Sequence, residues 1–181
     1  MIDISKFPQS VRNALTSETF RVKCQKTTDA VELMVVGDIG DESQAGLNSL
    51  GVIDFLSENV GTPVNVRINS GGGLVFDGLG IYNALKTHDA PVTTVNEGLA
   101  FSAASLIFMA GERRMMHEAS QFGIHRAMGV AIGNQREMKA VAEILASIDQ
   151  SLVGIYAAGT GQSESKIAES MDGTSDGTMW T

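Results

Sequence analysis

Two segments with the composition of β-strands flank a segment with helical hydrophobic spacing, and this succession constrains the fold most strongly. The strands are expected at 64–69 and 91–95. Between them, apolar side chains recur at the intervals of one helix face, at Val75, Leu79, Tyr82 and Leu85. Apolar strands joined through a helix are typical of parallel sheets with helices covering their faces. We therefore predict an α/β fold built on a parallel sheet.

The other segments continue this alternation of strands and helices. Two strands are expected near 19–25 and 31–36, and one or two short strands are expected within 112–125. Further helices are expected within 42–59, 100–111, 134–158 and 163–171. Because ligands of parallel sheets bind beyond the carboxyl ends of the strands, the loops expected after residues 69 and 95 are the places to look for chemistry.

The composition excludes several classes of protein. The chain has 181 residues, a net charge of -8 and no cluster of lysine and arginine, so we expect one domain that does not bind nucleic acid. No apolar run approaches the roughly 20 residues of a membrane span, and the start lacks the pattern of a secretory signal. The single Cys24 offers neither a disulfide nor a metal-ligand spacing. We expect a cytoplasmic protein without metal or cofactor.

The segment after the first strand, "INSGGG", is rich in glycine. Gly72 and Gly73 can adopt positive φ and expose amide N–H groups near the start of a helix, where an oxyanion would be stabilised. The alternative is a tight turn that binds nothing. The segment lacks the lysine of a phosphate-binding loop and fits a dinucleotide fingerprint poorly.

The segment after the second strand, "NEGLAFSAAS", contains two serines among small residues. Ser102 lies at the expected start of a buried helix, where the helix dipole favours an alkoxide and the N–H of Ala103 points to the same space. Ser105 lies one turn further on and is expected to bond to a helix carbonyl. The alternative for both serines is simple packing.

His125 is the candidate general base. It follows a short apolar strand in "QFGIH" and precedes a glycine-containing loop, which suits a base held at the edge of a cleft. His88 lies at a helix end and His117 in an exposed turn, so both have weaker cases. A lone histidine is usually structural, so His125 is a candidate base only in combination with Ser102 and the glycines.

The combination of these motifs resembles the proteolytic subunit of the Clp protease family. The motifs are "INSGGGLVFDGLGIYNAL", "GLAFSAASLIFMAG", "FGIHRAMG" and "YAAGTGQSESKI", and the resemblance extends from about residue 30 to the end. It is greatest to the phage and prophage members that act as head-maturation or scaffold proteases. The resemblance implies a ClpP/crotonase-like fold of repeated ββα units with a protruding handle helix at 134–158.

The resemblance also implies roles for the site residues. Ser102 matches the nucleophile and His125 the base, while Gly72, Gly73 and the N–H of Ala103 match the oxyanion region. The aspartate that orients the base is harder to place, because the family spacing falls on Gly177. We predict that Asp176 fills this role rather than Asp172. The alternative is that both are turn residues.

The resemblance implies a single protease domain over 1–181, with a lead at 1–18, and we expect the C-terminal part of the family to be missing. It also implies a homo-oligomeric ring, a heptamer or stacked rings, that acts on a peptide or protein substrate. The alternative is that the apolar stripe of 134–158 packs only within its own chain. An ATPase partner is not expected, because the N-terminus lacks the hydrophobic axial loop at which an unfoldase docks.

Two other functions remain open from the sequence. A crotonase-fold acyl-CoA enzyme would use the same glycine segment and helix start without needing Ser102 or His125. A non-catalytic assembly subunit would explain the displaced aspartate.

Overall fold

The computed structural model describes residues 25–26, 29–40, 47–172 and 178–180. The expected lead at 1–18, most of the strand expected near 19–25, and Asp176 lie outside this part of the chain. The described elements alternate between strands and helices along most of their length.

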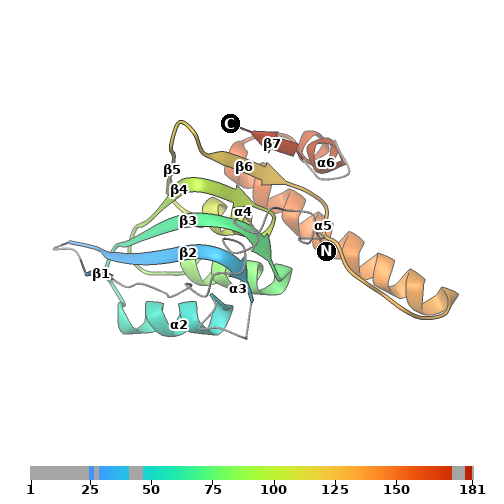
Figure 1. The fold of residues 1–181 in the computed structure, drawn as a ribbon, viewed down its shortest axis with the longest axis horizontal. Helices are drawn as coiled ribbons and strands as arrows, with labels where there is room; N and C mark the ends of the chain where they lie inside the picture. Colours follow the sequence, from blue (N-terminus) through green and yellow to red (C-terminus); the bar gives the residue numbers. More distant parts are fainter. Residues whose placement is uncertain (1–24, 27–28, 41–46, 173–177, 181) are drawn as a thin grey trace, which may run out of the picture.

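A single sheet forms the centre of the molecule (Figure 1). Its parallel core consists of β2 (Val31–Ile39), β3 (Val64–Gly73) and β4 (Val92–Phe101), in that order. Along its other edge, β4 pairs in parallel with β5 (Arg113–Met116) and β6 (Gln121–Ile124). The outermost strands, β1 (Gln25–Lys26) and β7 (Thr178–Trp180), pair antiparallel with β2 and β6. The predicted parallel sheet is confirmed.

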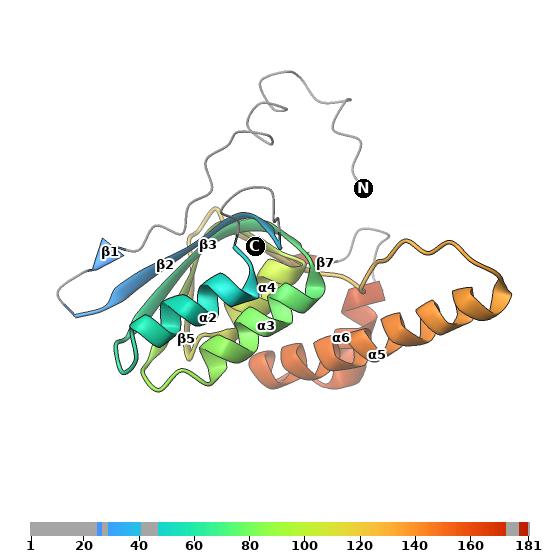
Figure 2. The ribbon, with the colours of Figure 1, turned by 90° about the horizontal axis from the view of Figure 1, so that it is seen from below.

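Helices α2 (Ser49–Glu58), α3 (Val75–Lys86) and α4 (Ala103–Ala110) lie together on one face of this sheet (Figure 2). The side chains of β2 alternate between the face that the helices cover and the opposite face. Leu33 and Val35 are buried, whereas the alternate positions Glu32 and Met34 are only half-buried. The side of the sheet that these three helices cover is therefore the buried side.

Strands β3 and β4 both continue beyond their predicted ends, so the loops expected after residues 69 and 95 are wrong. Pairing persists at Ser70↔Ala100 between β3 and β4, and at Ile39↔Gly73 between β2 and β3. Both ladders shift register on the way, which is typical of β-bulges. The polar and small residues of these segments are also compatible with extended backbone, and the glycines allow the irregular register.

Helix α4 is the most deeply buried helix of the described chain, because all eight of its residues are buried. It lies between the sheet and α3, which contacts it at Gly78. A Cβ added at Gly78 would lie 2.9 Å from the Cβ of Ala103. The small residues at the start of α4 thus allow two helices to approach closely next to Ser102.

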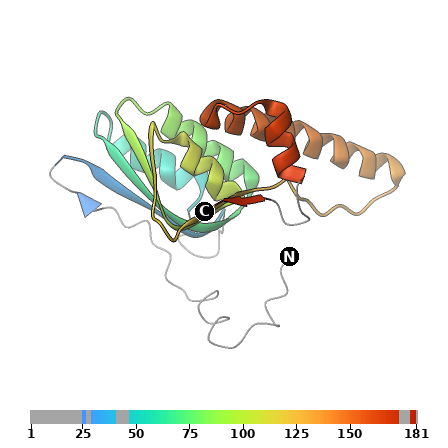
Figure 3. The same ribbon diagram turned by 90° about the horizontal axis from the view of Figure 1, so that it is seen from above.

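Helix α5 (Gln135–Thr160) is the long amphipathic helix predicted at 134–158. Asn134 caps its N-terminus in a capping box with Glu137, and Gly161 ends it with a φ of 72°. The C-terminal half contacts α4 and α6 (Glu164–Asp172), while the N-terminal half extends beyond the rest of the molecule (Figure 3). The protruding helix is confirmed.

Helix α5 also differs from one expectation. By length and composition alone it could cross a membrane, since one 18-residue window has a mean hydropathy of 1.3. No membrane span is expected from the sequence, because Glu143 and Asp149 interrupt the apolar residues of this helix. One such helix is weak evidence for a membrane span. The buried Leu152, Val153 and Tyr156 make its C-terminal half part of the core of this fold.

Candidate active site

Ser102 occupies a sharp junction between β4 and α4. It is the only non-glycine residue of the described chain with positive φ, at 55°, a conformation that costs free energy in any residue with a side chain. Its N–H donates to the carbonyl of Gly123, which ties the junction to β6. As the N-cap of α4, Ser102 makes no hydrogen bond to the helix through its side chain. Its hydroxyl is therefore available for another partner.

That partner is His125, the residue that follows β6. The Nε2 atom of His125 lies 2.7 Å from the Oγ of Ser102. The imidazole stacks on the ring of Phe101, with centroids 5.1 Å apart and an interplanar angle of 21°. Because β4 and β6 are parallel neighbours, their carboxyl ends bring the two side chains together. Both residues are candidates on sequence grounds, and the structure places them in contact.

A carboxylate for the other side of the imidazole is not found among the described residues. Asp172 ends α6, and both of its oxygens accept hydrogen bonds from the guanidinium of Arg126. Arg126 thereby lowers the pKa of Asp172. Asp176 lies outside the described residues, so its role stays a prediction.

The predicted oxyanion residues lie next to Ser102. A Cβ added at Gly72, whose φ is 101°, would lie 2.6 Å from the Cβ of Ser102 and 2.9 Å from the amide nitrogen of Ala103. The N–H of Gly72 already donates to the Oγ of Ser70, at 3.1 Å. This bond leaves the amides of Gly73 and Ala103 as the better candidates for an oxyanion.

A cavity of about 260 Å³ opens beside Ser102 and His125. The start of α3, the residues after His125 and the C-terminal half of α5 form its walls, and most of the lining side chains are apolar. Leu74 and Phe76 on its α3 side are 59% and 68% exposed, so the cavity has an open rim. A cavity of this kind can take an apolar side chain of a ligand next to the hydroxyl of Ser102.

Tyr156 is a residue of the site that the sequence analysis did not identify. Its hydroxyl lies 2.7 Å from the Oγ of Ser105, which donates to the carbonyl oxygen of Ser102 at 2.6 Å. The predicted bond from Ser105 to a helix carbonyl is thus confirmed. Burial raises the pKa of Tyr156, and its hydrogen bond with Ser105 offsets part of this rise. In the sequence, Tyr156 is only one more apolar position of a helix stripe.

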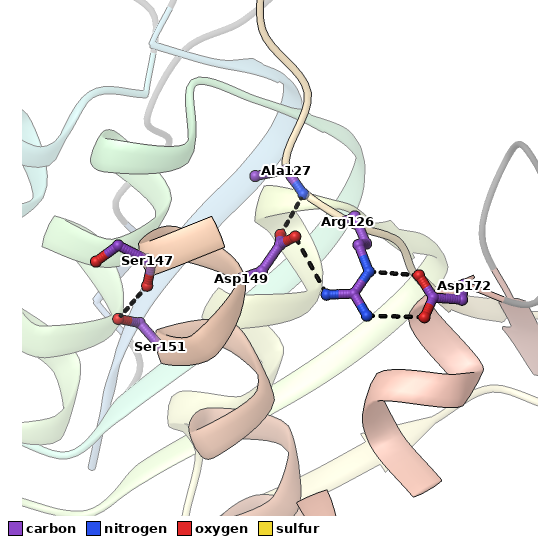
Figure 4. A network of polar contacts seen from close by, with 6 residues as sticks. All are labelled: Arg126, Ala127, Ser147, Asp149, Ser151 and Asp172. Atoms are coloured by element: carbon purple, nitrogen blue, oxygen red, sulfur yellow. Dashed lines mark hydrogen bonds and ion pairs between the residues drawn. The ribbon is translucent and has the colours of Figure 1, made fainter. Parts of the chain in front are cut away.

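Arg126 and Asp149 were also not identified from the sequence. Arg126 lies between Asp149 on α5 and Asp172 at the end of α6 (Figure 4). The hydrogen bond to Asp172 contributes most to raising the pKa of Arg126. The sequence did contain one indication of this contact. Asp149 is a charged residue next to Ile148 in the apolar stripe of the long helix, and a buried carboxylate requires a partner.

The remaining histidines have partners elsewhere. The Nε2 of His88 lies 2.9 Å from the carbonyl oxygen of Thr62, and the Nε2 of His117 lies 3.2 Å from a carboxylate oxygen of Glu97. Neither lines the cavity beside Ser102.

The chain is similar to known proteins in sequence and in fold. The model of the Clp protease family matches residues 18–179. The ATP-dependent Clp protease proteolytic subunit 1 of Salinibacter ruber is 29% identical over 142 residues, and the corresponding subunit of Pleurastrum terricola is 31% identical over 142 residues. The matched region is 77% of this chain in both cases, and it spans 61% of the Salinibacter protein and 72% of the Pleurastrum protein.

Similarity to a solved structure supports the fold. A ClpP1 mutant from Listeria monocytogenes superposes with a TM-score of 0.66 at 24% sequence identity, covering 77% of this chain and 78% of that one. The α/β ClpP-like fold predicted from the sequence is therefore confirmed.

Proposed function

Because the chain belongs to the Clp protease family, we propose that it is a serine endopeptidase that cleaves peptide bonds through an acyl-enzyme. Ser102 is the nucleophile and His125 the general base. The observation that carries this proposal is the distance of 2.7 Å between the Oγ of Ser102 and the Nε2 of His125. Both side chains line the same open cavity, where a peptide has access to them.

In the proposed reaction, His125 takes the proton of Ser102 as the hydroxyl oxygen attacks the substrate carbonyl. The amides of Gly73 and Ala103 stabilise the tetrahedral oxyanion, with Gly72 providing close backbone approach. His125 then gives its proton to the leaving amine, and water releases the acyl group from Ser102 by the reverse sequence.

Asp176 is proposed to orient the imidazole. It lies in the short stretch between the end of α6 and β7, and β7 pairs with β6, the strand that leads to His125. Asp172 is less suited to this role, because both of its oxygens are bonded to Arg126.

The proposal extends to assembly and biological setting. A homo-oligomeric ring, a heptamer or stacked rings, is supported by exposed apolar side chains on the protruding half of α5, including Met138 and Ile144. The substrate is a peptide or protein and the location is the cytoplasm. A role in phage capsid or scaffold maturation without an ATPase rests on the sequence resemblance alone.

The test is labelling of the purified full chain with a fluorophosphonate probe, together with a peptide cleavage assay. We expect the wild-type chain to be labelled at Ser102. Ser102→Ala and His125→Ala should each lower cleavage by at least about a thousandfold while the chain remains folded. Asp176→Asn should reduce the rate more than Asp172→Asn.

A folded wild-type chain that takes up no probe at any pH would contradict the hydrolase function and favour a non-catalytic assembly subunit. Turnover of a thioester by Ser102→Ala would favour an acyl-CoA enzyme instead.

A further inference from the structure

We propose that Arg126 is a positioning residue for His125, because it joins the chain directly after the base to both α5 and α6. This inference rests on the proposed peptidase function. It concerns the orientation of the imidazole, and Arg126 itself has no role in proton transfer or in contact with substrate.

The contacts of Arg126 reach two separate helices. Its Nε and Nη2 atoms donate to the two carboxylate oxygens of Asp172, with 2.8 Å between Nη2 and Oδ2. Its Nη1 atom lies 3.3 Å from Oδ2 of Asp149. The planar guanidinium thus binds α6 in a bidentate pair and α5 through a third contact (Figure 4).

Asp149 binds the same segment a second time. Its Oδ1 accepts a hydrogen bond from the backbone N–H of Ala127, at 2.7 Å. The residue is only 7% exposed, and a buried carboxylate is costly unless it is paired and hydrogen-bonded. Both of its partners come from the two residues that follow His125. This buried carboxylate therefore fixes the backbone at the exit from the base.

The chain beyond this point offers little other support. Residues 128–133 form no helix or strand, and Val130 and Ile132 are almost fully exposed, at 97% and 98%. The exposed segment therefore begins at Met128, after the half-buried Arg126 and Ala127. Among the described residues, its ring contacts are the hydrogen bond to Ser102 and the stacking on Phe101. On the C-terminal side, the constraint comes from the polar contacts of Arg126 and Asp149, together with the packing of Ala127 against the core.

The chain offers a matched control in Arg67. Its side chain is 41% exposed, against 40% for Arg126, and its guanidinium also bridges two carboxylates, those of Glu32 and Glu97. Arg67 lies within β3 and does not line the cavity beside Ser102. Arg67→Gln therefore removes an arginine that bridges two carboxylates, at a place away from His125.

The experiment compares Arg126→Gln, Arg126→Lys, Asp172→Asn and Arg67→Gln in the full chain. Peptide cleavage gives kcat and KM, and fluorophosphonate labelling gives the reactivity of Ser102 without peptide binding. A misplaced base should lower kcat and the labelling rate of Arg126→Gln by about 10- to 100-fold, with KM changed less than about twofold. Lysine should restore part of the rate, and Arg67→Gln should match the wild type.

Asp172→Asn keeps the buried Asp149 paired and tests the contact with α6 even where Arg126→Gln fails to fold. We expect it to lose part of the labelling rate at unchanged KM. A wild-type labelling rate in folded Arg126→Gln or in Asp172→Asn, or a loss seen only in KM, would overturn the positioning role alone. An unreactive wild-type chain would overturn the proposed function, and the role of Arg126 with it.

Discussion

At the scale of single residues, the site depends on backbone conformations that few side chains tolerate. Ser102 adopts a positive φ at the end of β4, and Gly72 and Gly73 adopt positive φ at the end of β3. The strained serine is held by contacts on both sides, through its N–H to Gly123 and through its carbonyl to Ser105. Strain of this kind persists only where the surrounding structure determines it, and here it directs the hydroxyl toward His125.

Gly72→Ala should therefore damage both stability and activity. The added Cβ would meet the Cβ of Ser102 at 2.6 Å, and the φ of 101° disfavours any side chain. We expect a loss of about 1–3 kcal/mol in the free energy of unfolding and a lower rate of fluorophosphonate labelling. Urea denaturation and labelling kinetics measure the two effects.

Gly71→Ala is the control for that variant. A Cβ at Gly71 meets nothing within 4 Å, and its φ lies outside the positive range, so its stability should change by no more than about 0.5 kcal/mol. Equal damage in both variants would mean that general loss of glycine flexibility, and not contact with Ser102, is responsible.

The site residues that could be predicted are those with a recognisable motif in the neighbouring sequence. Ser102 and His125 each lie at the end of a strand, so their neighbours in the chain were informative, and the parallel sheet brings them together. Arg126, Asp149 and Tyr156 have partners 22 to 51 residues away in the sequence. No local pattern specifies such partners, which is why these residues were not identified.

At the scale of the elements, a buried hydroxyl pair joins α4 and α5 next to Ser102. Tyr156 comes from α5 and Ser105 from α4, and both are buried. Tyr156→Phe should lower the free energy of unfolding by about 1 kcal/mol near neutral pH, since it removes one buried hydrogen bond. Tyr82 on α3 is half-buried, and its hydroxyl makes no hydrogen bond within the described part of the chain, so the control Tyr82→Phe should be closer to neutral.

The raised pKa of Tyr156 adds a pH dependence with a definite sign. The unfolded chain ionises this phenol near pH 10, whereas the folded chain holds it protonated to higher pH. The contribution of this group to stability is therefore fully present below about pH 10 and is lost as the pH rises from there toward the folded pKa. Urea midpoints should fall more steeply above about pH 10 for the wild type than for Tyr156→Phe. Parallel curves would contradict this.

The elements themselves were predicted well where hydrophobic spacing was regular. Helices α3, α5 and α6 lie within two residues of their expected ranges at most ends, as Asn134 and Gly161 show for α5. The ends of β3 and β4 were wrong, because glycine and small polar residues look like loop and here continue the ladder. Pairing with a neighbouring strand decided these ends, and such pairing is not visible in one segment of sequence.

At the scale of the whole molecule, exposed apolar side chains on the protruding half of α5 predict self-association. Met138 and Ile144 are 45% and 56% exposed. If they contact another copy of the chain, Met138→Glu and Ile144→Glu should shift the assembly to smaller species in analytical ultracentrifugation. Gln150→Glu adds the same charge at an exposed position of the same helix and should leave the assembly unchanged. A wild-type chain that is monomeric at all concentrations would contradict the ring.

Strand β7 is the last described element of the chain to be synthesised, and it borders the strand that leads to the site. It pairs with β6 at Phe122↔Trp180, and β6 leads directly to His125. A ribosome produces Ser102 and His125 before it produces Thr178, so β6 lacks this neighbour while the chain is still growing. We therefore expect the edge of the sheet beside His125 to be completed only after translation has passed β7.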